Sequence, residues 1–252
     1  SNHLLTLIME ALGHRLPGKV VIARPSFALF ESHAQYSGIT YVPWELDPDF
    51  QYSRALLPDL PDGSLVIFAS PNNPTGSSLP KPMFRALLQE FPRVLFLADE
   101  AYYEFDADPY TDLLSEFSNL IILRTLSKTM GAAGVRLGYA IGSSELIGAI
   151  TKLRLPYLLN HFTMEAARVI FTNPDMMAFV QRNISNAKTE RDYLFRELQP
   201  LSAAGHVQII PSQANFLLLR WPKQEDCDRV YLGLKAKGIL VRNVSGGPKL
   251  HG

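Results

Sequence analysis

Four short stretches of this 252-residue chain contain residue types that could act together at one chemical site. In "RTLSKTMGAAGVRLG", Lys128 follows an apolar run, and Arg136 comes eight positions later in a segment of small residues. A buried ammonium without a partner is costly, so such a lysine is usually neutralised, paired or used covalently. The other three stretches are "RPSF" with Phe27, "SPNNPTG" with Asn73, and "DEAY" with Asp99 and Tyr102. Whether they meet depends on the elements that carry them.

Each of the four stretches follows an apolar run of strand length. The runs cover 19–24, 64–70, 93–99 and 119–125, and their unbroken hydrophobicity is typical of strands buried on both faces of a parallel sheet. A helical pattern over 80–91 supplies a crossover between the second and third runs. The first two-thirds of the chain are therefore predicted to form a mostly parallel, doubly wound α/β domain.

The last third of the chain has a different pattern. A charged helical stretch over 176–198 precedes the apolar runs "HVQIIP", "NFLLLRW" and "GILVR" and a helix near 226–237. We expect a large domain over 1–175 and a smaller α+β domain over 176–252. Because the chain opens on "SNHLLTLIMEALG" without an initiator methionine and ends on "GGPKLHG", we also expect a fragment that lacks both natural termini.

All four stretches follow strands at their carboxyl ends, where ligands collect in open α/β sheets. Each has an ordinary explanation by itself: "NNPTG" as a turn, Asp99 as a cap, Phe27 as a core residue and Lys128 as a surface lysine. One ligand, pyridoxal phosphate (PLP), would explain them together. PLP needs an amine for a Schiff base, a carboxylate at its pyridine nitrogen, an aromatic stacking face and donors for its oxygens. The sequence therefore predicts a PLP site.

The predicted roles in this site follow from the residue types. Lys128 supplies the amine, and Asp99 keeps the pyridine nitrogen protonated. Phe27 stacks on the ring, while Asn73 and Tyr102 donate to the phenolic oxygen. The phosphate is assigned to the helix opening at Ser1 and Asn2, to Thr125 and Ser127, and to the guanidinium of Arg136.

The motifs, in this order, resemble the fold-type I aminotransferases of class I and II over essentially the whole chain. The elements "NPTG", "DEAY" and "SK…R" carry this resemblance, and "RTLSK…AG.R.G" and "RLPYLLN" are most similar to the histidinol-phosphate aminotransferase branch. The resemblance implies that Lys128 forms the imine and moves the proton, with Asp99 and Tyr102 as catalytic partners. It also implies substrate contacts from Asn73 and from Arg242, the latter at the substrate's phosphate.

The resemblance further implies a reaction and an assembly. The reaction is transamination of L-histidinol phosphate with 2-oxoglutarate, giving imidazole acetol phosphate and glutamate in histidine biosynthesis. The enzyme is expected to be a cytoplasmic homodimer. Two family residues are expected beyond the ends of this sequence: an arginine that grips the substrate carboxylate and an aromatic residue that reaches the partner subunit's cofactor.

Other functions stay open at this point. The same cofactor serves aromatic amino-acid aminotransferases and threonine-phosphate decarboxylases. A nucleotide-binding module would need a phosphate loop, but neither GxGxxG nor GxxxxGK[ST] occurs in the chain. A non-catalytic protein of the same fold would have no reason to keep Lys128, Asp99 and Arg136 together.

The composition argues against several other classes of protein. Lys and Arg together number 24, as do Asp and Glu, so the chain has no charge excess for binding nucleic acid. No apolar run is long enough to cross a membrane. The six histidines lack metal-ligand spacing, so no metal site is expected. The single Cys227 excludes an internal disulfide and suits a reducing cytosol.

Overall fold

The main feature of the fold is a six-stranded sheet. The structure is a computed structural model, and it describes residues 1–106 and 108–251. The strand order is β2-β1-β3-β4-β5-β6. The strands are β1 (Val20–Arg24), β2 (Tyr41–Glu45), β3 (Leu65–Ala69), β4 (Leu95–Asp99), β5 (Leu120–Thr125) and β6 (Gly138–Gly142). The first five are parallel, and β6 runs antiparallel to β5. The predicted mostly parallel sheet is therefore confirmed.

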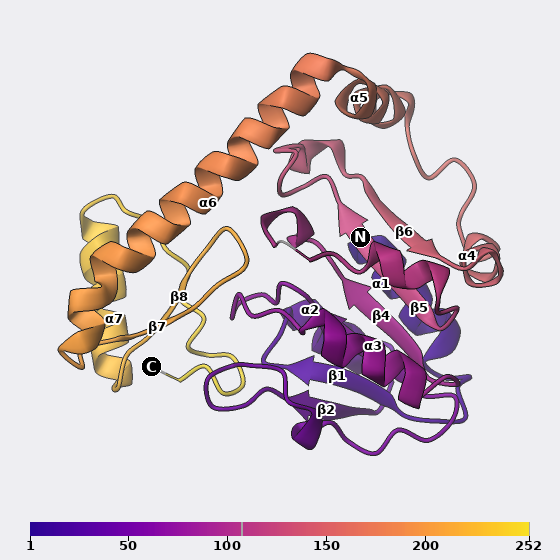
Figure 1. The fold of residues 1–252 in the computed structure, drawn as a ribbon, viewed down its shortest axis with the longest axis horizontal. Helices are drawn as coiled ribbons and strands as arrows, with labels where there is room; N and C mark the ends of the chain where they lie inside the picture. Colours follow the sequence, from indigo (N-terminus) through magenta and orange to yellow (C-terminus); the bar gives the residue numbers. More distant parts are fainter. Residues whose placement is uncertain (107, 252) are drawn as a thin grey trace.

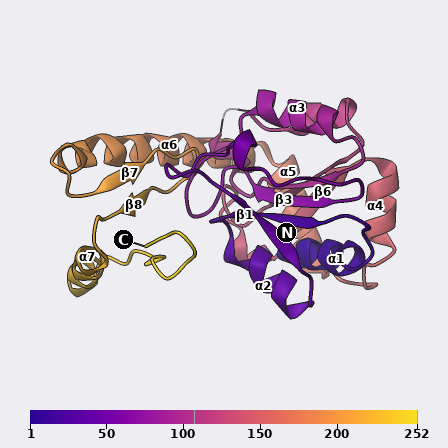
Figure 2. The ribbon, with the colours of Figure 1, turned by 90° about the horizontal axis from the view of Figure 1, so that it is seen from below.

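Helices cover both faces of this sheet (Figure 1), and Figure 2 shows the two helical layers on either side of the strands. One face carries α3 (Lys81–Glu90); the other carries α1 (Asn2–Leu12), α2 (Ala28–Tyr36) and α4 (Ser144–Thr151). Successive residues of a strand point to opposite faces. In β3, Val66 and Phe68 pack in the core beneath α3, whereas Leu65 and Ile67 pack beneath α1 and α2. Burial on both sides explains the unbroken apolar runs.

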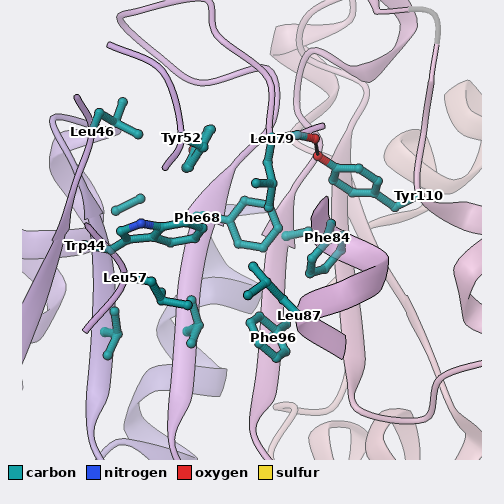
Figure 3. Close-up of a cluster of buried hydrophobic side chains, with 14 of the residues drawn as sticks. Trp44, Leu46, Tyr52, Leu57, Phe68, Leu79, Phe84, Leu87, Phe96 and Tyr110 are labelled. Atoms are coloured by element: carbon teal, nitrogen blue, oxygen red, sulfur yellow. Dashed lines mark hydrogen bonds between the residues drawn. The ribbon is translucent and has the colours of Figure 1, made fainter. Parts of the chain in front are cut away.

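The core beneath α3 is built around aromatic side chains (Figure 3). The ring of Phe68 lies 5.0 Å from that of Phe84 and 6.3 Å from that of Trp44, measured between centroids. Trp44 comes from β2, which the sequence analysis did not predict because Pro43 interrupts its pattern. Proline is tolerated there because β2 is an edge strand. The opposite edge strand, β6, also escaped prediction, since its sequence "GYAIG" begins and ends on glycine.

The C-terminal third of the chain is arranged around one long helix. Helix α5 (His161–Thr172) leads to α6 (Pro174–Ala203), and α6 runs to the two-stranded antiparallel sheet of β7 (Gln208–Ile210) and β8 (Leu218–Arg220) and to α7 (Gln224–Ala236) (Figure 1). Helix α6 exceeds the predicted 176–198 at both ends. Its start is capped by Asn173, whose side chain accepts the N–H groups of Asp175 and Met176. The apolar run at 239–241 forms no helix or strand, and Leu240 is 83% exposed.

Four short 3₁₀ helices complete the described structure, and two of them flank the candidate site. They are η1 (Arg54–Leu56), η2 (Tyr103–Phe105), η3 (Thr111–Ser115) and η4 (Ala133–Val135). Among the helices of the described ranges, none has both the length and the apolar character that crossing a bilayer requires.

Candidate active site

A cavity of about 320 Å³ lies at the carboxyl edge of the parallel strands. Its volume is within the range of small-molecule sites. The structure brings all ten residues predicted to hold the cofactor into the lining of this cavity. They are Ser1, Asn2, Phe27, Asn73, Asp99, Tyr102, Thr125, Ser127, Lys128 and Arg136. Residues that are scattered along the sequence therefore surround one space.

Asp99 and Thr125 enter the cavity because they are the last residues of β4 and β5. Leu97 and Leu123, two positions earlier in each strand, pack on the α1 and α2 side, and strand alternation directs Asp99 and Thr125 to the same side. Asp99 is 6% exposed, and its Oδ1 accepts the backbone N–H of Ala101 at 3.0 Å. Burial raises the pKa of Asp99 to about 6. A cation placed against this carboxylate would restore its charged form.

Lys128 lies in the turn between β5 and β6. This turn is closed by two backbone hydrogen bonds, from Ala132 to Leu126 and from Leu126 to Leu137, both 3.1 Å long. The Lys128 amine lies 5.1 Å from the ring centroid of Tyr102 and, within the described residues, forms no ion pair. Its side chain is exposed rather than buried, because the turn lies beyond the end of the sheet. The amine is thus accessible from the cavity.

Hydroxyl and guanidinium donors gather beside this turn. Thr125 Oγ1 donates to Ser127 Oγ at 3.0 Å, and the Ser127 N–H donates to Thr125 Oγ1 at 3.2 Å. Arg136 adopts a left-handed backbone conformation, with φ of 59°, directly after η4. One of its guanidinium nitrogens donates to a backbone carbonyl at 2.9 Å, which leaves its other donors for a ligand. Two hydroxyls and one guanidinium suit a phosphate group.

The N-terminus of α1 adds backbone N–H donors on the same side of the cavity. Ser1 is the N-cap of this helix, and both Ser1 and Asn2 line the cavity. Gly138 in β6 permits this close approach, since a Cβ at Gly138 would lie 2.0 Å from the backbone nitrogen of Ser1. A helix N-terminus favours anions through its free N–H groups and its dipole.

Two aromatic rings frame the remaining walls. Phe27 is the N-cap residue of α2, and its ring meets that of Phe30 edge to face at 5.7 Å between centroids. Tyr102 is largely buried, and its ring meets Phe216 edge to face at 5.2 Å. Packing on one side of each ring fixes its orientation toward the cavity.

The two adjacent asparagines of "SPNNPTG" have different surroundings. Asn72 is fully buried: its Nδ2 donates to Pro25 O at 2.9 Å and to Thr75 Oγ1 at 2.8 Å, and its Oδ1 accepts from Ser26 Oγ at 2.5 Å. Asn72 therefore joins the loops that follow β1 and β3, a role that the sequence analysis missed. The Asn73 side chain makes no hydrogen bond among the described residues and lines the cavity.

One predicted site residue lies outside the cavity, and one residue that was not predicted lies in its lining. Arg242 is exposed in the segment after α7 and does not line the cavity, so its contact with substrate stays a prediction. His3 lines the cavity although no motif pointed to it. Its only signal in the sequence was its position next to Asn2 in the first turn of a helix.

The functional groups that line the cavity match those that PLP needs. An accessible amine, a buried carboxylate, the Asn73 amide, which has no hydrogen-bond partner in the part of the chain that the structure describes, and a group of phosphate donors face the same space. The close approach that Gly138 allows places the helix end beside the hydroxyls. These are the groups that a charged aromatic aldehyde with a phosphate requires.

Comparison with known proteins agrees with this arrangement. Residues 2–246 match the family model described as aminotransferase class I and II. The curated histidinol-phosphate aminotransferase of Parabacteroides distasonis is 36% identical over 257 residues, which cover all of this chain and 71% of that protein. The solved histidinol-phosphate aminotransferase of Clostridium acetobutylicum aligns with a TM-score of 0.83 at 25% identity, over 98% of this chain and 72% of that one. The enzyme of the same name from Sinorhizobium meliloti, solved in complex with pyridoxal-5'-phosphate, aligns with a TM-score of 0.78 at 25% identity, over 95% and 65% of the two chains.

Proposed function

This chain belongs to the class I and II aminotransferases, and we propose that it transfers the amino group of L-histidinol phosphate to 2-oxoglutarate. The products are imidazole acetol phosphate and glutamate, and the pathway is histidine biosynthesis. Support comes from the curated relatives that carry this activity in their names and from the "RTLSK" and "RLPYLLN" motifs. The observation that carries the proposal is the cavity in which Lys128 faces Asp99, Tyr102 and the phosphate donors.

The cofactor of this family is PLP, which when bound supplies a carbonyl that condenses with amines and an electron-withdrawing ring. The chain's own groups hold it and move the proton. Lys128 is the base that takes the proton from the substrate's α-carbon, because its amine is accessible from the cavity and lies 5.1 Å from the ring centroid of Tyr102. Asp99 holds a proton on the pyridine nitrogen, and the resulting cation in turn favours the ionised carboxylate.

The remaining residues of the cavity bind and orient. Asn73 and Tyr102 donate to the phenolic oxygen, and Phe27 stacks on the ring. The phosphate is held by the first turn of α1 at Ser1 and Asn2, by the hydroxyls of Thr125 and Ser127, and by Arg136. Arg242 contacts the phosphate of the substrate. Fixed donors of this kind lower the barrier by positioning and by electrostatic stabilisation.

We assign residues 1–175 to a large PLP-binding domain and 176–252 to a small domain of a cytoplasmic homodimer. The domain boundary is supported by α6, which begins at Pro174 and separates the two sheets. The dimer is supported by apolar side chains exposed between α4 and the first turns of α6. Tyr157 is 98% exposed and Phe162 is 89% exposed, and large apolar side chains exposed within one segment suit an interaction surface.

The test is an assay of the PLP-loaded full-length enzyme with 2-oxoglutarate and one amine donor at a time. The donors are L-histidinol phosphate, phenylalanine and threonine phosphate, and the measured products are glutamate and carbon dioxide. We expect glutamate with L-histidinol phosphate and no glutamate from the Lys128→Ala variant. If phenylalanine is the one donor that gives glutamate, the site belongs to an aromatic aminotransferase. If threonine phosphate releases carbon dioxide, the site belongs to a decarboxylase.

A further inference from the structure

A buried ion pair lies directly behind the candidate active site. Arg124 donates from Nε and Nη2 to Oε2 of Glu100, at 2.8 and 2.7 Å, and the two side chains are only 9% and 1% exposed. The other carboxylate oxygen of Glu100 accepts the backbone N–H of Tyr110 at 2.7 Å. The guanidinium also covers the ring of Tyr103, with Cζ 3.5 Å from the ring centroid. We call Glu100, Tyr103 and Arg124 the Arg124 cluster.

Each member of the Arg124 cluster is the chain neighbour of a residue assigned to the cofactor. The three neighbouring pairs are Asp99–Glu100, Tyr102–Tyr103 and Arg124–Thr125. None of the three cluster residues lines the cavity. In β5, Ile122 packs in the core beneath α3, and Arg124, two positions later, points to that same side. Arg124 therefore lies on the opposite face of β5 from Thr125, and the Glu100 carboxylate that it binds lies on that same opposite side.

The position of the ion pair suits it to fixing how the ends of β4 and β5 are aligned more than to raising the free energy of unfolding. Removing two charges from water is costly, and a buried ion pair often contributes little net stability. Its hydrogen bonds are directional, however, and they join β4 and β5 where the register between the two strands ends, at Asp99 and Leu123. Burial acts to lower the pKa of Arg124, but the Glu100 carboxylate holds that pKa above its usual value. The guanidinium thus stays charged and bonded.

We propose that Glu100 and Arg124 are positioning residues that align the ends of β4 and β5, and with them Asp99 and Thr125, for binding PLP. This inference rests on the proposed function of the cavity as a PLP site. It assigns the ion pair no contact with cofactor or substrate. Tyr103 extends the same alignment to its neighbour Tyr102 through its contact with the guanidinium.

The test compares PLP affinity with stability in the full-length protein. The variants are Arg124→Met, which keeps an apolar stem, Arg124→Lys, which keeps the charge without the fork, and Glu100→Gln. The control is Leu88→Ala, which opens a cavity in the core beneath α3, away from the site. For each protein we would measure the dissociation constant of PLP by fluorescence titration and the midpoint of urea unfolding.

We expect the PLP dissociation constant of Arg124→Met to rise about tenfold to a hundredfold, the effect seen when partners behind metal ligands are removed. Arg124→Lys and Glu100→Gln should lie between it and the wild type, and Leu88→Ala should bind PLP normally despite its lower unfolding midpoint. The double variant Glu100→Leu/Arg124→Met should regain stability without regaining affinity.

Two results would overturn the inference. One is equal loss of PLP affinity in Leu88→Ala and Arg124→Met, and the other is recovery of affinity together with stability in the double variant. If Arg124→Met does not fold, Arg124→Lys and Glu100→Gln decide by the same comparison. A wild type that binds PLP but makes no glutamate from L-histidinol phosphate would refute the proposed function. The PLP dissociation constants of the variants would still test the role of the ion pair.

Discussion

Replacing Asp99 by asparagine should stabilise the cofactor-free protein and lower the rate of glutamate formation by the PLP-loaded enzyme. Burial raises the pKa of Asp99 to about 6, from 3.8 for an exposed carboxyl. This difference of about two units corresponds to a cost of about 3 kcal/mol for ionising Asp99 in the folded state. An asparagine at this position removes the cost and can still accept the N–H of Ala101, now 3.0 Å from Asp99 Oδ1.

The pH dependence follows from the sign of this shift. Because the folded pKa exceeds the unfolded one, the unfolded state loses its proton first as the pH rises, and stability falls between about pH 4 and pH 6. Above pH 6 the penalty is constant. Asp99→Asn should therefore equal the wild type near pH 4 and exceed it by up to about 3 kcal/mol at pH 7 and above.

The assay is urea unfolding of wild type and Asp99→Asn, with and without PLP, from pH 4 to pH 8. In the PLP-loaded proteins the advantage of asparagine should shrink or reverse, because the cofactor's cation pairs with the wild-type carboxylate. Glutamate formation by Asp99→Asn should fall about 100-fold or more, as when one fixed electrostatic partner of a reacting group is lost. A stability difference that does not change with pH in the cofactor-free proteins would refute the reasoning.

Two further substitutions test the cavity wall and the core. Gly138→Ala should weaken PLP binding, because the new Cβ would lie 2.0 Å from the Ser1 nitrogen and would displace the N-terminus of α1. The matched control is Gly148→Ala in α4, where a Cβ would meet nothing within 4 Å beyond the backbone of its own helix, and its PLP dissociation constant should be unchanged. Phe68→Ala should lower the free energy of unfolding by about 3–5 kcal/mol, since a fully buried ring at the centre of the aromatic core is lost. Urea unfolding measures this loss, and a change below about 1 kcal/mol, typical of surface substitutions, would show that the ring does not pack as described.

The central strands and their ends were predictable from the sequence for a local reason. β1, β3, β4 and β5 are buried on both faces, so each is an unbroken apolar run that ends where its polar motif begins. Parallel strands bring their carboxyl ends to one edge, which is why residues predicted from four separate motifs line one cavity. The edge strands β2 and β6 have one open side and lack this signal.

Other features depended on contacts that no local pattern records. Asn72 and Asn73 are adjacent and identical in type, yet only the fold decides that Asn72 binds neighbouring loops while Asn73 faces the cavity. Arg242 was predicted from the resemblance alone. Its placement depends on how the segment after α7 packs, and it lies outside the cavity.

The chemical groups of the site can be read from the sequence without a structure: the amine of Lys128, the carboxylate of Asp99, the phosphate donors and the apolar strands that precede them. The protonation and pairing of these groups depend on how the chain packs. The raised pKa of Asp99 comes from burial, and the ion pair of Glu100 with Arg124 comes from the alignment of two strands that are distant in the chain. Solvent exclusion and long-range pairing are properties of packed atoms, so they arise only once the sheet has formed.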